Sequence, residues 1–376
     1  MAGIYLHIPF CKTRCTYCDF YSTTQQDLSS TYIEALCKEL KLRNEYLDNE
    51  VISSIYLGGG TPSQLDITEL KAIFSTIADN YSFANEMEIT LEANPDDLTP
   101  EYIEQLKCLP INRLSIGTQT FHDEMLKKLN RRHNSKQAIE AIAEAQKQGF
   151  NNISIDLMYG LPGETMKEWE EDLETAIQLN IQHISAYHLI YEEGTPLFRN
   201  LEKGLITEVD EELSLSFFKK LIEKLTHNGF IHYEISNFAK PNKLAQHNTS
   251  YWLGSKYLGC GPSAHSFNGE SRDYNAALLS EYIKALNQDN LVVEKEILSQ
   301  QSKYNDFIIT RLRTMWGVSL TEIHEQFGKE FKEYTLRASE KHLKQENLVL
   351  INDRLKLTAK GIFLSDGIMS DLLIVS

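Results

Sequence analysis

Residues 11–18 of this chain read CKTRCTYC, and they directly follow the apolar stretch IYLHIP at residues 4–9. Cys11, Cys15 and Cys18 therefore lie on the loop that leaves the first predicted strand, with the spacing C-x3-C-x2-C. Thiolates at this spacing can surround one iron–sulfur cluster or one zinc ion. A structural zinc ion needs four ligands and a cubane cluster has four irons, so a loop with three cysteines leaves one metal position open.

Two other interpretations of these cysteines remain. In the first, the three cysteines are unrelated buried thiols. In the second, they bind a zinc ion whose fourth ligand is His7 or Asp19. The chain has six cysteines in 376 residues, which is too few for a disulfide scaffold. The other three are scattered and are predicted to be ordinary buried thiols: Cys37, Cys108 and Cys260.

Short β-rich stretches alternate with helical patterns along the first half of the chain. Six βα units in succession predict a parallel sheet covered by helices, either doubly wound or closed into a full or partial barrel. Polar or Gly-rich sets follow several of the strands, which favours one shared mouth at the carboxyl ends of barrel strands. The predicted strands span residues 4–9, 53–60, 87–95, 113–120, 153–160 and 183–190.

Charge and composition exclude several classes of protein. The chain carries 53 acidic and 37 basic residues, a formal charge of −16, which disfavours nucleic acid as a partner. It contains no apolar run of about 18 residues and begins without a signal-peptide pattern, so we expect a cytoplasmic protein.

The sequence predicts three regions. Residues 1–230 form the core barrel, residues 231–299 connect and complete the barrel mouth, and residues 300–376 form a small helical unit that resembles a winged helix. A winged helix could bind DNA. However, residues 300–376 hold 11 Lys/Arg and 10 Asp/Glu, so they lack a basic footprint and are interpreted as a structural cap.

The cysteine motif, with Tyr17 before its third cysteine, resembles the signature of the radical S-adenosylmethionine (SAM) superfamily, whose partial barrel has six βα units. The resemblance implies a [4Fe–4S] cluster on Cys11, Cys15 and Cys18, with SAM chelating the open iron through its amino and carboxylate groups. It also implies an electron donor for the cluster, since the transferred electron cleaves SAM to a 5′-deoxyadenosyl radical.

Further residues are similar to the SAM contacts of one branch, the group of coproporphyrinogen dehydrogenase (HemN) and HemW. The stretch GGGTP at 58–62 resembles the loop that binds the methionine ammonium of SAM, because glycines let backbone groups approach a ligand closely. Taken singly, each polar candidate could be a solvated surface residue as easily as a SAM contact. The set implied by the resemblance is Tyr5, Tyr17, Gly60, Thr61, Pro62, Glu92, Gln119, Arg131 and Asp156.

Two differences separate the chain from coproporphyrinogen dehydrogenases. Those enzymes have a further cysteine two positions after the third, where this sequence has Phe20, and an N-terminal extension, whereas here the first strand begins near Gly3. Residues 247–252 read HNTSYW, which resembles the H-N-x-x-Y-W motif of HemW, regarded as a haem chaperone. The resemblance implies haem and an acceptor haemoprotein as partners.

His247 is the candidate haem ligand that the motif supplies, and His188 and His265 are rivals that are also expected near the barrel mouth. The purely structural interpretation of the motif is that its Tyr and Trp side chains pack into the barrel mouth and close it. Two other functions stay open: an oxygen-independent coproporphyrinogen III dehydrogenase, and a structural or redox cluster without radical chemistry. The sequence leaves open the acceptor, SAM cleavage, the oligomeric state and a peripheral membrane contact.

Overall fold

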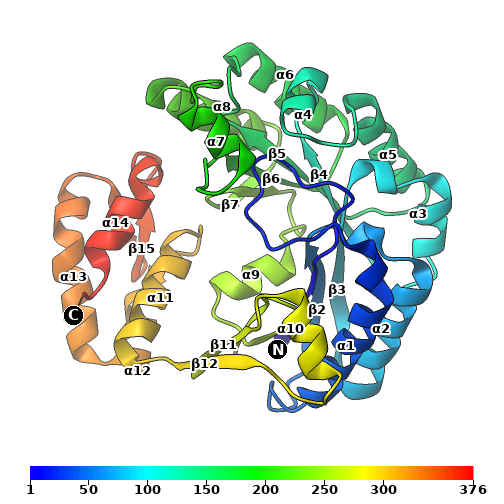
Figure 1. Cartoon of the computed structure of the whole chain (residues 1–376). Helices are drawn as coiled ribbons and strands as arrows, with labels where there is room; N and C mark the ends of the chain where they lie inside the picture. Colours follow the sequence, from blue (N-terminus) through cyan, green and yellow to red (C-terminus); the bar gives the residue numbers. More distant parts are fainter. Residues whose placement is uncertain (376) are drawn as a thin grey trace.

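The computed structural model describes residues 1–375, in which six parallel strands follow one another with helices between them. Figure 1 shows the helices on the outside of a curved sheet. The strands are β1 (Ala2–Ile8), β2 (Ile52–Gly59), β3 (Phe83–Ala93), β4 (Arg113–Gln119), β5 (Ile153–Tyr159) and β6 (His183–His188). The helices along them are α1 (Ser29–Leu42), α2 (Ile67–Asn80), α3 (Pro100–Leu106), α4 (Asp123–Lys128), α5 (Ser135–Lys147), α6 (Met166–Gln178), α7 (Pro196–Glu202) and α8 (Glu211–His227).

Local sequence explains where several of these helices begin. Helices α2, α5 and α6 each start with a capping box, in which Asp66, Asn134 and Thr165 accept from the backbone three residues on. Their apolar faces pack on strands that are buried nearly throughout, as is usual for a covered parallel sheet.

The barrel does not close on itself. Strand β1 pairs in parallel with β9 (Tyr257–Cys260) on its free side, and β6 pairs antiparallel with β8 (Asn237–Ala239). The sheet is completed by β7 (Ile231–Glu234), β10 (His265–Phe267), β11 (Ser271–Asn275) and β12 (Val293–Ile297), which makes β7 and β12 its two edges. The predicted α/β partial barrel is therefore confirmed.

Two further helices belong to the segment between β8 and the C-terminal unit. They are α9 (Gln246–Trp252), which packs against β1 and β2, and α10 (Leu279–Leu286), which packs against α1. A buried ion pair also ties this segment to α1, because Arg43 bridges Glu39 at 3.2 Å and Asp273 at 3.1 Å.

The C-terminal unit has its own apolar core around Tyr304 and lies to one side of the barrel, orange to red in Figure 1. A tight turn at Asn352 and Asp353, both at positive φ, joins the two strands of a hairpin. The elements are α11 (Gln300–Leu312), β13 (Val318–Ser319), α12 (Leu320–Phe327), α13 (Lys329–Lys344), β14 (Leu348–Ile351), β15 (Arg354–Leu357) and α14 (Ser365–Leu372). No helix within residues 1–375 is long and apolar enough to cross a bilayer.

Candidate cofactor site

The cysteine motif lies on a loop whose base is closed by backbone hydrogen bonds. Cys11 N donates to Thr23 O at 2.9 Å, and Thr23 N donates to Pro9 O at 2.7 Å. The residues between Cys11 and Thr23 therefore form a closed lobe at the carboxyl end of β1. This arrangement holds all three cysteines at the mouth of the barrel.

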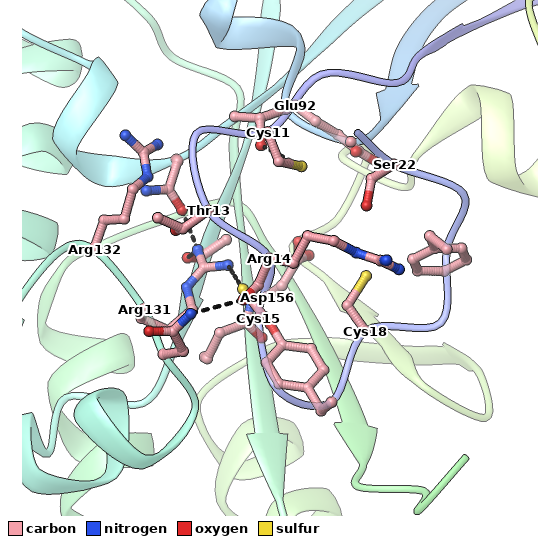
Figure 2. Close-up of a pocket in the computed structure, with 18 of the residues that line it drawn as sticks. Cys11, Thr13, Arg14, Cys15, Cys18, Ser22, Glu92, Arg131, Arg132 and Asp156 are labelled. Carbon is pink, nitrogen blue, oxygen red and sulfur yellow. Dashed lines mark hydrogen bonds between the residues drawn. The ribbon is translucent and has the colours of Figure 1, made fainter. Parts of the chain in front are cut away.

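The lobe covers a cavity of about 400 Å³ whose walls come from the lobe itself and from the ends of β2 to β6 (Figure 2). Most of the residues implied by the resemblance line this cavity. They are Cys11, Cys15, Tyr17, Cys18, Gly60, Thr61, Glu92, Gln119, Arg131 and Asp156. Tyr5, Pro62 and His247 are not among the lining residues.

The thiols suit a multi-iron cluster better than a single ion. All three are free, and Thr61 Oγ1 and Arg131 Nη1 each donate to a cysteine sulfur at 3.3 Å, which offsets thiolate charge. Within residues 1–375 no three His, Cys, Asp or Glu side chains come close enough together to hold one metal ion. His7 cannot complete a zinc site, because its ring nitrogens contact Tyr5 OH at 3.1 Å and Tyr21 O at 2.9 Å. The residues present therefore fit an iron–sulfur cluster.

Burial controls the protonation of the thiols. It raises the pKa of Cys11, and it raises the pKa of Cys18 to about 11. Without metal both thiols are therefore protonated at neutral pH, and cluster assembly must displace those protons.

Two carboxyl groups on the cavity wall have strongly altered acidity. Burial raises the pKa of Glu92 to about 7, and the neighbouring charge of Asp156 adds to the effect. Burial likewise raises the pKa of Asp156 to about 6. Glu92 accepts from Tyr56 OH at 2.7 Å and from Gly59 N at 3.2 Å, which fixes the carboxyl at the glycine loop. Such a pair can receive a cationic or hydroxyl-bearing ligand without a large desolvation cost.

Close backbone approaches explain two of the glycines. A Cβ on Gly60 would lie 2.7 Å from Ile8 O, so the glycine loop can pack on β1 only without a side chain. A Cβ on Gly117 would lie 3.1 Å from Arg131 Nη2, the group that donates to Gly117 O at 2.5 Å. Gln119 has φ 70° at an irregular register between β4 and β5, which redirects its side chain into the cavity.

Comparison with known proteins agrees with this geometry. Residues 5–176 match the Radical SAM superfamily and residues 298–364 match the HemN C-terminal domain. The chain is 33% identical to "Heme chaperone HemW" of Lactococcus lactis over 98% of its own length and 97% of that protein. The chain belongs to the HemW family of radical SAM proteins. It is also 34% identical to "Heme chaperone HemW" of Bacillus subtilis, over 88% of each chain.

The solved structure of coproporphyrinogen III oxidase (HemN) from Escherichia coli has the same fold as this HemW-family chain. The TM-score is 0.85 over 99% of this chain and 89% of that one, at 24% sequence identity. The likeness thus extends through the C-terminal unit.

His247 of the HNxxYW motif lies at the opposite end of the barrel from the cysteine lobe. Its ring is buried next to Gly3 of β1, Nδ1 is 2.8 Å from Ser54 Oγ, and Nε2 is 2.7 Å from Tyr251 OH. These strand positions are near the amino ends, so the expectation that α9 completes the mouth is wrong. The error arises because the sequence pattern does not indicate which end of the barrel the chain crosses after β8. Burial lowers the pKa of His247 to about 3, so the ring is neutral.

The two rival histidines are more accessible. His188 ends β6, is exposed, and its Nε2 lies 2.6 Å from Ser214 Oγ. His265 in β10 is exposed and packs edge-on against Tyr274. Neither lines the cavity below the cysteine lobe.

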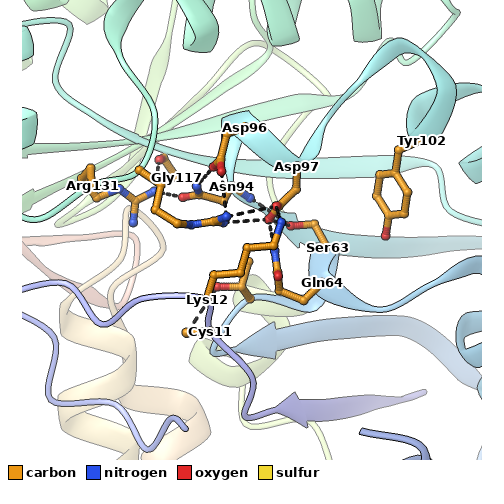
Figure 3. A network of polar contacts seen from close by, with 12 residues as sticks. Cys11, Lys12, Ser63, Gln64, Asn94, Asp96, Asp97, Tyr102, Gly117 and Arg131 are labelled. Carbon is orange, nitrogen blue, oxygen red and sulfur yellow. Dashed lines mark hydrogen bonds and ion pairs between the residues drawn. The ribbon is translucent and has the colours of Figure 1, made fainter. Parts of the chain in front are cut away.

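One important residue of the site was missed from the sequence. Asp97 ends the short 3-10 turn η3 (Pro95–Asp97) and is buried. It accepts from Lys12 Nζ and Ser63 Oγ, each at 2.9 Å (Figure 3), and from Arg132 Nη2 at 3.0 Å. It also accepts from Gln64. This carboxylate therefore ties the cysteine lobe to the segments that follow β2 and β3. Its only sequence signal is the acidic pair after Pro95.

Proposed function

We propose that this chain is a cytoplasmic haem chaperone of the HemW type, which carries a [4Fe–4S] cluster, binds SAM, and transfers haem to an acceptor haemoprotein. The observation that carries the proposal is the single cavity that gathers three free cysteines and the polar strand ends, in a chain a third identical to HemW proteins along its length. Neither feature alone specifies haem handling; together they favour it over a generic radical SAM role.

Each side chain has a role in this proposal. Cys11, Cys15 and Cys18 hold the cluster, and Arg131 offsets the charge at Cys15. Glu92, held by Tyr56 and Gly59, accepts the ammonium of SAM. When bound beside a reduced cluster, SAM would supply radical chemistry at this site.

Gln119, Asp156 and Thr61 face the same cavity and supply further polar contacts for SAM. Tyr5 and Pro62 do not line the cavity and in this proposal act through other residues. Tyr5 orients His7 beneath the lobe, and Pro62 begins the turn η2 (Pro62–Gln64) that carries Ser63 to Asp97. The cluster would need an external electron donor as a partner.

Haem titration tests the proposal. The anaerobically reconstituted full chain is titrated with haem and followed by its Soret band, and the loaded protein is then mixed with an apo-haemoprotein. We expect saturable binding at micromolar protein, followed by transfer. The absence of a stable haem complex would refute the chaperone role.

A parallel incubation addresses the other enzymatic function. The reconstituted chain is given SAM, a reductant and coproporphyrinogen III, and the products are separated. We expect no protoporphyrinogen, since Phe20 stands where coproporphyrinogen dehydrogenases have their further cysteine. Formation of that product would identify the chain as a decarboxylase instead.

A further inference from the structure

A second cavity, of about 610 Å³, lies between the barrel and the C-terminal unit. Helix α8 and strand β7 supply one wall, and the end of α11, the residues after β15 and the 3-10 turn η4 (Gly361–Leu364) supply the other. Cofactor sites often lie at such boundaries and combine apolar walls with a few polar groups. The apolar walls here are made by Ile222, Leu312, Leu357, Ile362 and Phe363.

Direct contacts hold the two walls together. Met315 N donates to Tyr233 O at 2.9 Å, and Glu234 forms a β-bridge with Thr314. The Phe363 ring of η4 packs edge-on against Phe218 of α8 at 5.4 Å. The cavity is therefore a defined feature of the interface.

Two cations, Lys219 and Arg313, line this cavity together with the carboxyl groups of Glu223 and Glu234. Within residues 1–375 no carboxylate lies within 4.0 Å of Lys219 Nζ or of the Arg313 guanidinium, whereas the next lysine, Lys220, pairs with Glu170 at 3.1 Å. Arg313 Nε is buried and has no hydrogen-bond partner. Glu223 pairs with Lys220 at 3.4 Å, so within the described residues Lys219 and Arg313 have no ion-pair partner and can receive an anionic, largely apolar ligand.

A buried carboxyl in the same cavity also lacks a partner. Glu234 is 3% exposed, and its Oε2 makes no hydrogen bond. Burial raises its pKa, while the hydrogen bond from Asn237 and the nearby charge of Arg313 oppose that rise.

The lining also offers two ligands that haem iron accepts. The Met315 side chain is 39% exposed. His232 Nε2 lies 3.1 Å from Ile235 O, and because a carbonyl only accepts, that nitrogen carries the proton and Nδ1 keeps a lone pair. The His232 ring is held flat on Phe238, with centroids 4.2 Å apart. Thioether and imidazole are both established axial ligands of haem.

We propose that haem binds in this interdomain cavity, an inference that rests on the haem-chaperone function proposed above. The porphyrin packs on the apolar walls, and Lys219 and Arg313 pair with its two propionates. Met315 and His232 are the candidate iron ligands. This site is separate from the cavity below the cysteine lobe, and it does not use His247, whose two ring nitrogens are already engaged.

Haem titration of charge-reversal variants tests the site. The double variant Lys219→Glu/Arg313→Glu is compared with Lys167→Glu/Lys344→Glu, which makes the same change in net charge at exposed helix positions remote from the cavity lining. We expect the cavity variant to bind haem at least about tenfold more weakly, since each charged hydrogen bond lost corresponds to roughly that factor. The control variant should keep the wild-type Kd.

Spectra of ligand variants give a second readout. We expect Met315→Leu or His232→Phe to shift the Soret maximum, with thermal unfolding and far-ultraviolet circular dichroism confirming that each variant is folded. If the wild type binds haem but the cavity variants match it in Kd and spectrum, the interdomain site is refuted and the chaperone function stands. If the wild type itself does not bind haem, the chaperone function fails.

Discussion

The buried carboxylate of Asp97 gives the sharpest test of how the cysteine lobe is held. The substitution Asp97→Asn removes one charge and replaces an acceptor oxygen with an NH2 group, with almost no change in volume. Lys12 donates to Oδ1, whereas Ser63 and Arg132 Nη2 donate to Oδ2, so the new NH2 would meet at least one of these donors whichever oxygen it replaces. We therefore expect the lobe to lose its anchor to the turns after β2 and β3.

The cost follows from the exposure of each partner. Lys12 is 55% exposed, so its ion pair is screened and contributes about 1 kcal/mol at most. Arg132 is 17% exposed and keeps its 2.7 Å pair with Asp96, so losing Asp97 removes a charged hydrogen bond worth about 1.5–3 kcal/mol without stranding a charge. Together these terms predict a loss of about 3 kcal/mol in the free energy of unfolding.

Urea unfolding of the apo chain measures this loss of stability. The iron and sulfide content after anaerobic reconstitution measures how well the cysteine lobe still holds a cluster. Asp96→Asn is the matched control, because it removes the other partner of Arg132 but leaves the bonds to Lys12 and Ser63. We expect Asp97→Asn to lower both stability and cluster content, and the control to retain its cluster. Equal stability and equal iron content in Asp97→Asn and wild type would show that Asp97 does not anchor the lobe.

Three other perturbations test the site more briefly. Gly60→Ala should lower the free energy of unfolding by about 1–3 kcal/mol and weaken SAM binding, because the new Cβ would lie 2.7 Å from Ile8 O. The control Gly367→Ala meets nothing within 4 Å and should be neutral or stabilising, and calorimetry compares the two variants. Glu92 has a raised pKa of about 7, so its contribution to the stability of the fold is full below about pH 4.5 and is lost as pH rises through 7. Glu92→Gln should therefore flatten the pH dependence of Tm of the apo chain, and an unchanged slope would contradict this. His247 has a lowered pKa of about 3, so its contribution is full above pH 6.5 and is lost as pH falls toward 3; His247→Gln should make Tm less sensitive to acid, and equal acid sensitivity would argue against a buried neutral ring.

Local pattern was sufficient for the barrel strands and for the cysteine lobe. Apolar strands such as β5, buried on both faces, stand out from the amphipathic helices around them, and the chain order of parallel βα units leaves few topologies. The polar residues that end those strands meet at one mouth because parallel strands share their carboxyl ends. Glu92 and Asp156 were identifiable for that reason.

Other features depend on contacts that leave no local pattern. Strand β9 pairs with β1 across some 250 residues of chain, and nothing in residues 257–260 indicates that partner. The same holds for α9, whose burial under the amino ends of β1 and β2 is set by tertiary packing. The positive φ of Gln119 and the convergence of donors on Asp97 are likewise products of the assembled fold.

Helix α9 gives the HNxxYW motif a structural connection to both cavities. On one side the His247 ring stacks on Tyr56 at 5.2 Å, and Tyr56 donates to Glu92 at the wall of the cofactor cavity. On the other side Trp252 lies under the Arg313 guanidinium, 5.2 Å away, and Arg313 lines the interdomain cavity. Under the proposed haem site, a histidine with no free ring nitrogen can thus affect haem binding without touching iron. Its loss would shift α9, and with it Arg313, which we propose pairs with a propionate. Loss of haem on mutation of His247 therefore does not identify an axial ligand unless the Soret position of the residual complex also changes.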